Sequence, residues 1–348
     1  MPRTVAEQVA ESSDHKPGRL RLQCGAVRAV VIEDGQVTVG ERPDPAPGPG
    51  ELLVDVCAAG LNGADLIQRA GLYPPPPGIP ADIPGLELAG RVIGLGEGCQ
   101  RYGIGDRVMS IVGGAGQAEL ALVPEATAMP VPDSLSWEEA GGCPEAFTTA
   151  HDALLTQGGL KAGDRLLVTG GAGGVGLAGL QIGVLTGAQV TASVHRPELR
   201  ARVAAFGATA VDPAEVADHG PYDVVLELVG APNLSTDLRA LATGGRIVVI
   251  GVGQGSRTEI DLLQIMAKRA VLRGSTLRAR PLHDKAAAAA LVERDVVPAL
   301  AAGSARVPVD QVFPLDEVQA AYERFATGGK LGKIVLATGS AVAGGTGT

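Results

Sequence analysis

A glycine-rich loop between a short apolar strand and a helix constrains the fold more than any other feature of this sequence. Residues 165–169 have the pattern of an apolar strand and residues 176–185 that of a helix, and Gly171, Gly173 and Gly176 have the spacing GxGxxG. In a dinucleotide-binding loop, one glycine permits a tight turn, one lets backbone N–H groups approach a pyrophosphate, and one lets helix and strand pack closely. Because the chain holds 50 glycines, the spacing alone does not exclude a structural turn. The flanking strand and helix favour a dinucleotide site formed by Gly171, Gly173, Gly174, Val175 and Gly176.

Strands and helices continue to alternate after this loop. Apolar strand patterns cover residues 189–194, 224–229, 246–251 and 270–275, and a helical pattern covers residues 198–206. Apolar strands separated by helices indicate a parallel sheet that is covered on both faces. Their number and spacing predict a doubly wound, six-stranded dinucleotide domain.

The chain before this region has a different pattern, with short strands separated by turns rich in proline and glycine. Residues 27–32 and 36–39 predict a hairpin, and residues 117–123 a further strand. Helical periodicity appears in residues 147–155 and 286–292, after which short strands return. We predict an α/β chain in which a β-rich domain (26–148 and 294–338) has the dinucleotide domain (149–293) inserted in it. Residues 1–25 and 339–348 are predicted to be a disordered leader and tail.

Charge and hydropathy exclude several classes of partner. The net charge of -9 disfavours nucleic acid, because an acidic surface repels phosphate. No apolar run reaches the roughly 18–20 residues that span a bilayer, and residues 1–23 lack the apolar middle of a secretory signal. The sequence predicts a soluble, cytoplasmic protein that binds neither nucleic acid nor membrane.

The cysteines and histidines do not form a metal-binding pattern. Cys24, Cys57, Cys99 and Cys143 are far apart, and the 5 histidines are scattered. A structural zinc lobe needs closely spaced cysteines. We therefore predict no metal site, and we expect the cysteines to be small buried side chains.

The end of the second strand of the dinucleotide domain indicates which cofactor is bound. NAD-binding folds place an acidic residue there to hold the ribose hydroxyl. This chain has Ser193, His195 and Arg196 in that segment, with no acid before Glu198. Serine and arginine can bind a 2′-phosphate, which a carboxylate repels, so we predict NADPH. The alternative is that Arg196 is a solvated charge at the start of a helix.

Several other segments carry a family resemblance that runs from about residue 26 to 337. They are residues 61–69, 71–77, 144–150, 273–278 and 332–336. The chain resembles the medium-chain dehydrogenase/reductases, and within them the zinc-free NADPH:quinone oxidoreductases of the p53-inducible-gene-3 type. It departs from that pattern at Gly63, where the family often has arginine, and at Phe147, where it often has tryptophan. Both departures concern the substrate rather than the class of reaction.

The resemblance implies a GroES-like catalytic domain, a Rossmann domain, and a cleft between them for the nicotinamide. Asn62, Asp65 and Tyr73 are then expected to line that cleft, with Tyr73 orienting or protonating an oxygen. Simpler roles are a helix cap for Asn62, a surface charge for Asp65 and packing on prolines for Tyr73. The other residues expected at the cofactor, beyond the glycine loop and the strand end, are Thr148, Thr149, Gly251, Val252, Thr276, Leu277, Arg278 and Lys333.

The resemblance also bears on metal, assembly and reaction. In zinc-dependent relatives a cysteine stands at Asn62, a histidine at Leu86 and a third ligand near Glu145, so this chain is expected to work without zinc. A homodimer paired through residues 270–275 is expected. The implied activity is hydride transfer from NADPH to a quinone or enone. The alternatives are an enoyl-thioester or other alkene reductase, which includes natural-product tailoring enzymes, and a non-catalytic NADPH-binding protein.

Overall fold

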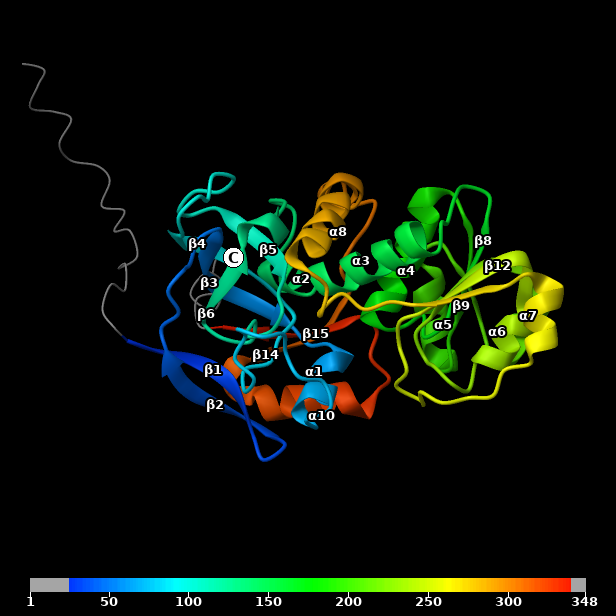
Figure 1. Ribbon diagram of the computed structural model, residues 1–348, viewed down its shortest axis with the longest axis horizontal. Helices are drawn as coiled ribbons and strands as arrows, with labels where there is room; N and C mark the ends of the chain where they lie inside the picture. Colours follow the sequence, from blue (N-terminus) through cyan, green and yellow to red (C-terminus); the bar gives the residue numbers. More distant parts are fainter. Residues whose placement is uncertain (1–24, 339–348) are drawn as a thin grey trace, which may run out of the picture.

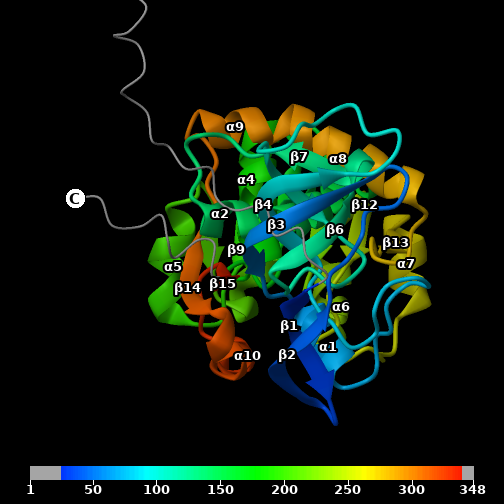
Figure 2. The ribbon, with the colours of Figure 1, turned by 90° about the vertical axis from the view of Figure 1, so that its left-hand side faces the viewer.

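The structure is a computed structural model that describes residues 25–338, and it contains two large sheets side by side (Figures 1 and 2). The six-stranded sheet is parallel throughout, in the order β10-β9-β8-β11-β12-β13. Its strands are β8 (Arg165–Val168), β9 (Gln189–Ser193), β10 (Thr209–Val211), β11 (Tyr222–Glu227), β12 (Leu241–Val249) and β13 (Val271–Gly274). Its helices are α4 (Gly174–Thr186), α5 (Pro197–Ala204), α6 (Leu234–Ala240) and α7 (Leu262–Lys268).

This strand order places the first strand of the unit, β8, at the centre of the sheet, beside the fourth, β11. The chain therefore leaves in opposite directions from two neighbouring strands, and ligands of such sheets bind at the carboxyl ends of those strands. The glycine loop follows β8 at this point. The predicted α/β class with a doubly wound parallel sheet is confirmed.

The second sheet is mixed and has seven strands, in the order β14-β15-β3-β4-β5-β7 with β6 paired to β3. Its strands are β3 (Glu51–Gly60), β4 (Glu87–Leu95), β5 (Arg107–Ile111), β6 (Leu120–Pro124), β7 (Ala128–Pro130), β14 (Val309–Pro314) and β15 (Lys333–Ala337). The predicted hairpin is β1 (Ala26–Glu33) and β2 (Gln36–Pro43), whose turn residues Asp34 and Gly35 have positive φ angles of 50° and 74°. The remaining helices are α1 (Gly63–Arg69), α2 (Trp137–Gly141), α3 (Pro144–His151), α8 (Leu282–Asp295), α9 (Val297–Ala301) and α10 (Val318–Thr327).

One apolar core joins the two sheets. Buried Ala89 and Met109 of the seven-stranded sheet belong to the same side-chain cluster as Leu166 and Leu226 of the six-stranded sheet. Helix α3, which lies between α8 and α4 in Figure 1, adds the fully buried Phe147 to it. The two halves are thus packed into one body, and residues from both can form one site.

The structure corrects several predicted elements. The strand expected at residues 117–123 begins at Leu120, because the Gln117 carbonyl oxygen and the Glu119 N–H bond to Val30 and Arg28 of β1. The helix expected to begin at Phe147 begins at Pro144, a residue suited to the first helical turn. Helix α10 lies where only short strands were expected, and it buries Ala321 and Tyr322 on one face. The short strand β10 was not predicted.

The remaining expectations concern the ends of the chain, the cysteines and the domain limits. The predicted leader and tail, apart from Gly25, and Cys24 lie outside residues 25–338. Cys57 and Cys143 are buried as expected, whereas Cys99 is partly exposed. The domain limits at residues 148 and 294 stay a prediction. No helix in the described part of the chain is long and apolar enough to cross a membrane.

Candidate active site

The glycine loop has the geometry that close approach of backbone requires. Gly170 has a positive φ of 62°, and Gly173 caps helix α4. A Cβ atom on Gly176 would lie 2.4 Å from the carbonyl oxygen of Gly170, so a larger residue there would push the helix off the loop. Because α4 starts at this loop, its unpaired N–H groups can face a pyrophosphate. The residues present therefore fit a dinucleotide.

Gly332, directly before strand β15, lies against this loop. The Gly332 N–H donates to the carbonyl oxygen of Ala172 at 2.9 Å, and Gly332 bridges to Gly173. The stem of Lys333 packs on Gly174, where a Cβ atom would lie 2.6 Å from its Cδ. Lys333, the first residue of β15 in the seven-stranded sheet, thus extends its side chain along the glycine loop.

The nitrogen of Lys333 is buried among oxygen atoms. It lies 2.5 Å from Oε1 of Glu87, and it donates to Oδ1 of Asn62 at 2.7 Å and to the Leu61 carbonyl oxygen at 2.9 Å. Asn62 Nδ2 donates to the same Glu87 oxygen at 2.9 Å. Asn62, Glu87 and Lys333 are all buried, so each charge has its partner within the cluster.

Asp65 is a fully buried carboxyl group behind Asn62. It accepts from the Asn62 N–H at 2.8 Å, from the Gly85 N–H at 3.2 Å and from Gln117 Nε2 at 3.3 Å. Burial raises the pKa of Asp65 to about 6, against the lowering effect of the Asn62 and Gly85 N–H groups and of Lys333. The alternative role of Asp65 as a surface charge is therefore wrong, and Asp65 fixes the start of α1 from within.

A second group of side chains gathers beside this cluster. Glu145, in the first turn of α3, is partly exposed, and its backbone N–H donates to Glu87 Oε2 at 2.8 Å. Its Oε1 accepts from Thr149 at 3.4 Å. Burial first, and then nearby Glu87, raise the pKa of Glu145 to about 8. A carboxyl group that holds a proton near neutral pH is suited to acid catalysis.

Tyr73 and Arg278 complete this group from two distant loops. Arg278 is buried, and its Nε, Nη1 and Nη2 donate to the carbonyl oxygens of Gly113 and Tyr73 and to Gln68 Oε1, at 2.8, 2.9 and 2.6 Å. Its guanidinium carbon lies 4.8 Å from the centre of the Tyr73 ring. Burial raises the pKa of the Tyr73 phenol. Arg278 thus joins the end of the six-stranded sheet to the loop that carries Tyr73.

The predicted 2′-phosphate site lies at the end of β9. Ser193 is buried, while His195 and Arg196 are exposed. The guanidinium of Arg196 lies against Gly329 and pairs with Glu198 at 3.6 Å, with about half of its side chain exposed. These residues meet at the same edge of the sheet as the glycine loop, because the Gly171 N–H donates to the Ser193 carbonyl oxygen at 3.1 Å.

The other predicted cofactor contacts follow strand ends of the same sheet or lie on α3. Gly251 follows β12, and a Cβ atom on it would lie 2.3 Å from the Leu228 carbonyl oxygen. Val252 and Thr276 are exposed, whereas Leu277 and Thr149 are buried. The hydroxyl of Thr148 is buried and has no hydrogen-bond partner.

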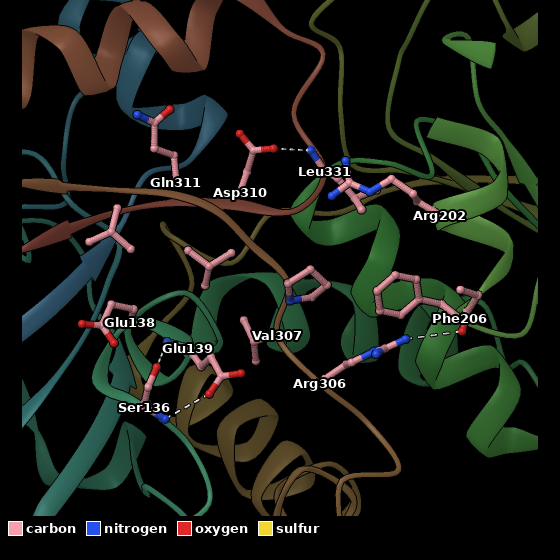
Figure 3. Close-up of a pocket in the computed structure, with 14 residues that line it drawn as sticks. Ser136, Glu138, Glu139, Arg202, Phe206, Arg306, Val307, Asp310, Gln311 and Leu331 are labelled. Carbon is pink, nitrogen blue, oxygen red and sulfur yellow. Dashed lines mark hydrogen bonds between the residues drawn. The ribbon is translucent and has the colours of Figure 1, made fainter. Parts of the chain in front are cut away.

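A cavity of about 740 Å³ lies between α2, α5 and β14 (Figure 3). Its walls include Arg306, whose guanidinium carbon lies 4.6 Å from the Phe206 ring centre, and Asp310, which accepts from the Leu331 N–H at 3.0 Å. None of the predicted site residues lines it. The candidate active site is therefore the side-chain group around Asn62 and Glu145.

Comparison with known proteins identifies the family. A family described as an alcohol dehydrogenase GroES-like domain matches residues 48–133, and one described as a zinc-binding dehydrogenase matches residues 201–336. The quinone oxidoreductase of Rattus norvegicus is 31% identical over 305 residues, which are 84% of this chain and 90% of that protein. The chain belongs to the medium-chain dehydrogenase/reductase family. The predicted family is confirmed, and it implies an oxidoreductase with a nicotinamide cofactor.

Two further proteins are similar to this dehydrogenase/reductase, one a solved structure and the other a much longer polyketide synthase. The structure of an alcohol dehydrogenase superfamily protein from Novosphingobium aromaticivorans has a TM-score of 0.80 and 27% identity, covering 90% of this chain and 99% of that one. Polyketide synthase GfsB of Streptomyces halstedii is 33% identical over 254 residues, which are 71% of this chain but 4% of that protein.

A zinc ion does not fit the residues of this dehydrogenase/reductase, although one matching family is described as zinc-binding. Zinc takes three or four thiolate, imidazole or carboxylate ligands. The described residues contain no group of three or more such side chains placed to hold a metal ion. The nitrogen of Lys333 instead takes the oxygen atoms of Asn62 and Glu87, and its positive charge would repel a second cation.

Glu87 and Glu145 were not predicted as site residues. Glu87 has a recognisable signal, since it is an acidic residue directly before the apolar residues Leu88 and Ala89 at the start of strand β4. A buried carboxylate in such a strand needs a cation, which is Lys333. Glu145 has a weaker signal, because an acidic residue in a first helical turn is common.

Proposed function

We propose that this chain is a metal-independent reductase that transfers hydride from NADPH to a quinone or a similar conjugated carbonyl compound. The observation that supports this most is the buried nitrogen of Lys333, 2.5 Å from Glu87 and 2.7 Å from Asn62. By the resemblance described above, zinc-dependent relatives carry metal ligands around Asn62 and Leu86. Here an ammonium group of the chain itself neutralises the buried carboxylate.

The residues of the site have separate roles in this proposal. When bound, the reduced nicotinamide supplies the hydride. Tyr73 orients the acceptor oxygen, and Asn62 lines the cleft while its carboxamide holds Lys333 and Glu87 in place. Asp65 positions Asn62 from behind through the 2.8 Å bond to its N–H. Conjugated carbonyl compounds accept hydride without a metal, because the electron pair is delocalised onto oxygen.

The choice of NADPH rests on the end of β9. His195 and Arg196 are exposed there, beside buried Ser193, and can face a 2′-phosphate. The nearest acid along the helix, Glu198, pairs with Arg196 at 3.6 Å. The cofactor contacts proposed elsewhere are the glycine loop, Thr149, Gly251, Val252, Thr276, Leu277, Arg278 and Lys333.

We also propose that the protein is a homodimer. Strand β13 is the last strand of its sheet, and Val271 and Leu272 are 44% and 40% exposed. Leu262, Leu263 and Met266 on α7 are about 70% exposed beside it. An edge strand with apolar neighbours can pair with its twofold mate.

The second candidate function is reduction of an enoyl thioester, and the match to a polyketide synthase favours it. One screen of acceptors distinguishes the two candidate functions. It measures the rate of NADPH oxidation with benzoquinone, cyclohexenone and crotonyl-coenzyme A. Faster turnover of the quinone or enone supports the proposal, and faster turnover of the thioester supports the second candidate. Tight NADPH binding without oxidation by any acceptor would indicate the non-catalytic alternative.

A further inference from the structure

The carboxyl group of Glu145 stands out among the acidic groups of the site. The two oxygens of Glu87 are engaged by Lys333, Asn62 and the Glu145 N–H, and those of Asp65 by three N–H donors. Glu145 makes no ion pair with any described residue, and the contact of its side chain is the 3.4 Å bond from Thr149. It is also the one of the three that is not fully buried.

Charged and titratable groups from several elements act on Glu145. Glu87 of β4, Asp65 of α1 and Lys333 of β15 are close enough to shift the pKa of Glu145. The charge of Glu145 in turn affects the pKa values of Tyr73, Arg278 and Lys285 of α8.

The cations among these groups already have partners. Lys333 is paired with Glu87, and Arg278 binds two carbonyl oxygens and Gln68. Lys285 reaches the Arg278 carbonyl oxygen at 3.5 Å. None of these cations forms an ion pair with Glu145, and burial of a carboxyl group without a paired cation favours the protonated acid.

We propose that Glu145 is the proton donor of the reduction, a role that rests on the proposed function. Glu145 gives its proton to the acceptor carbonyl oxygen, which gains an electron pair as the conjugated carbon takes hydride from the reduced nicotinamide. The O–H bond of Glu145 breaks, and the O–H bond of the enol forms. Glu145 is left as a carboxylate and takes a new proton from water, which its partial exposure allows.

Tyr73 is the other acid beside the acceptor, and it is the weaker one. Burial raises the pKa of its phenol above the usual value of about 10, whereas the pKa of Glu145 is about 8. A general acid is most effective when its pKa is near the working pH. Tyr73 therefore orients the oxygen, and Glu145 supplies the proton.

The test compares wild type with Glu145→Gln, which keeps the size of the side chain and an oxygen for Thr149. The probe is cyclohexenone, whose enolate is a strong base, and benzoquinone is a second acceptor with a less basic product. For wild type we expect kcat/KM for cyclohexenone to fall above about pH 8, where Glu145 ionises. For Glu145→Gln we expect a loss of roughly 10²- to 10⁴-fold below that pH and no such fall above it.

Two further variants and an infrared measurement make this test specific for the proton of Glu145. Glu323→Gln, an exposed change on α10, is expected to keep the wild-type profile. Glu145→Asp, which retains an acid, is expected to restore part of the activity and the pH dependence. The infrared difference between wild type and Glu145→Gln, recorded without cofactor at pH 7, is expected to show one protonated carboxyl group.

Each contrary outcome has its own meaning. A wild-type rate and pH profile in Glu145→Gln, or an ionised carboxylate in the infrared difference, overturns the donor role and leaves the proposed function standing. Absence of turnover by wild type with both acceptors and with the enoyl thioester overturns the proposed function and the donor role together.

Discussion

The side-chain nitrogen of Lys333 lies 2.7 Å from Oδ1 of Asn62, although 271 positions separate the two residues in the chain. The bond joins strand β15 to the start of α1, and the Lys333 stem packs against Gly174 of the glycine loop. One side chain thus connects the cofactor loop with a residue expected to line the cleft. Its charge also compensates the buried Glu87.

Lys333→Met is expected to destabilise the protein strongly. It leaves the Glu87 carboxylate buried without a cation, and loss of one partner of such a pair costs about 3–5 kcal/mol. Urea unfolding followed by circular dichroism measures the change. Combining it with Glu87→Gln is expected to recover much of the loss, and Lys161→Met, at an exposed position, is expected to change little. Equal stability of Lys333→Met and wild type would argue against the buried pair.

Arg196→Ala is expected to weaken NADPH binding by roughly 10- to 150-fold, since a charge-assisted contact with phosphate contributes about 1.5–3 kcal/mol. NADH binding is expected to stay unchanged, because NADH lacks the phosphate. Ser193→Asp is expected to invert the preference, since a carboxylate repels the phosphate and accepts from the ribose hydroxyl. Fluorescence titration with both cofactors measures this, with Glu198→Gln as the matched control that removes the pairing acid. Equal losses for NADPH and NADH would refute this assignment of the β9 end.

Leu272→Lys is expected to convert a dimer into a monomer. The change puts a charge on the exposed edge strand β13, beside the apolar side chains of α7. Light scattering at micromolar concentration measures the mass, and Leu72→Lys, at a 76% exposed position in the loop after α1, is the control. A wild-type protein that is monomeric at this concentration would contradict the proposed dimer.

Asp237→Asn is expected to stabilise the protein at alkaline pH. Asp237 is buried, its Oδ2 has no hydrogen-bond partner, and burial with the neighbouring Glu227 raises its pKa well above the usual range. The folded state therefore holds a proton that the unfolded chain releases above about pH 4, so this group costs stability as the pH rises from there. Asparagine offers Glu227 an N–H donor without titrating.

The measurement for Asp237 is the melting temperature at about pH 5 and about pH 8. The gain of Asp237→Asn over wild type is expected to be larger at the higher pH, by about 1–3 kcal/mol in stability. Asp218→Asn, an exposed change nearby, is expected to have no such dependence. A gain that is equal at both pH values would contradict the buried proton.

Local patterns account for what could be predicted from the sequence. The glycine loop, the alternating strands and the β1–β2 hairpin depend on neighbouring residues, and the structure contains all three. Helix α10 was missed although Val318, Ala321, Tyr322 and Phe325 have the helical spacing i, i+3, i+4 and i+7. Strand β10 has three residues, too few to show a periodicity.

The chemistry of the site depends on contacts that local patterns do not contain. The resemblance indicated Asn62 and Lys333 separately, but their bond arises only when β15 pairs with β3. Glu145 became a candidate because Glu87, Asp65 and Lys333 reach it from three other elements. Asp65 was open between a site residue and a surface charge. It is buried and in contact with Gln117, which is 52 positions away in the chain, and local patterns do not contain that contact.

If Lys333 replaces a metal in an NADPH-dependent reductase, removal of metal leaves catalysis unchanged. The decisive experiment measures NADPH oxidation by benzoquinone before and after treatment with a strong chelator, on protein whose zinc content has been determined. We predict less than stoichiometric zinc, the same rate after chelation and a slower rate with NADH. One zinc ion per chain, together with activity that chelation removes and zinc restores, would contradict it.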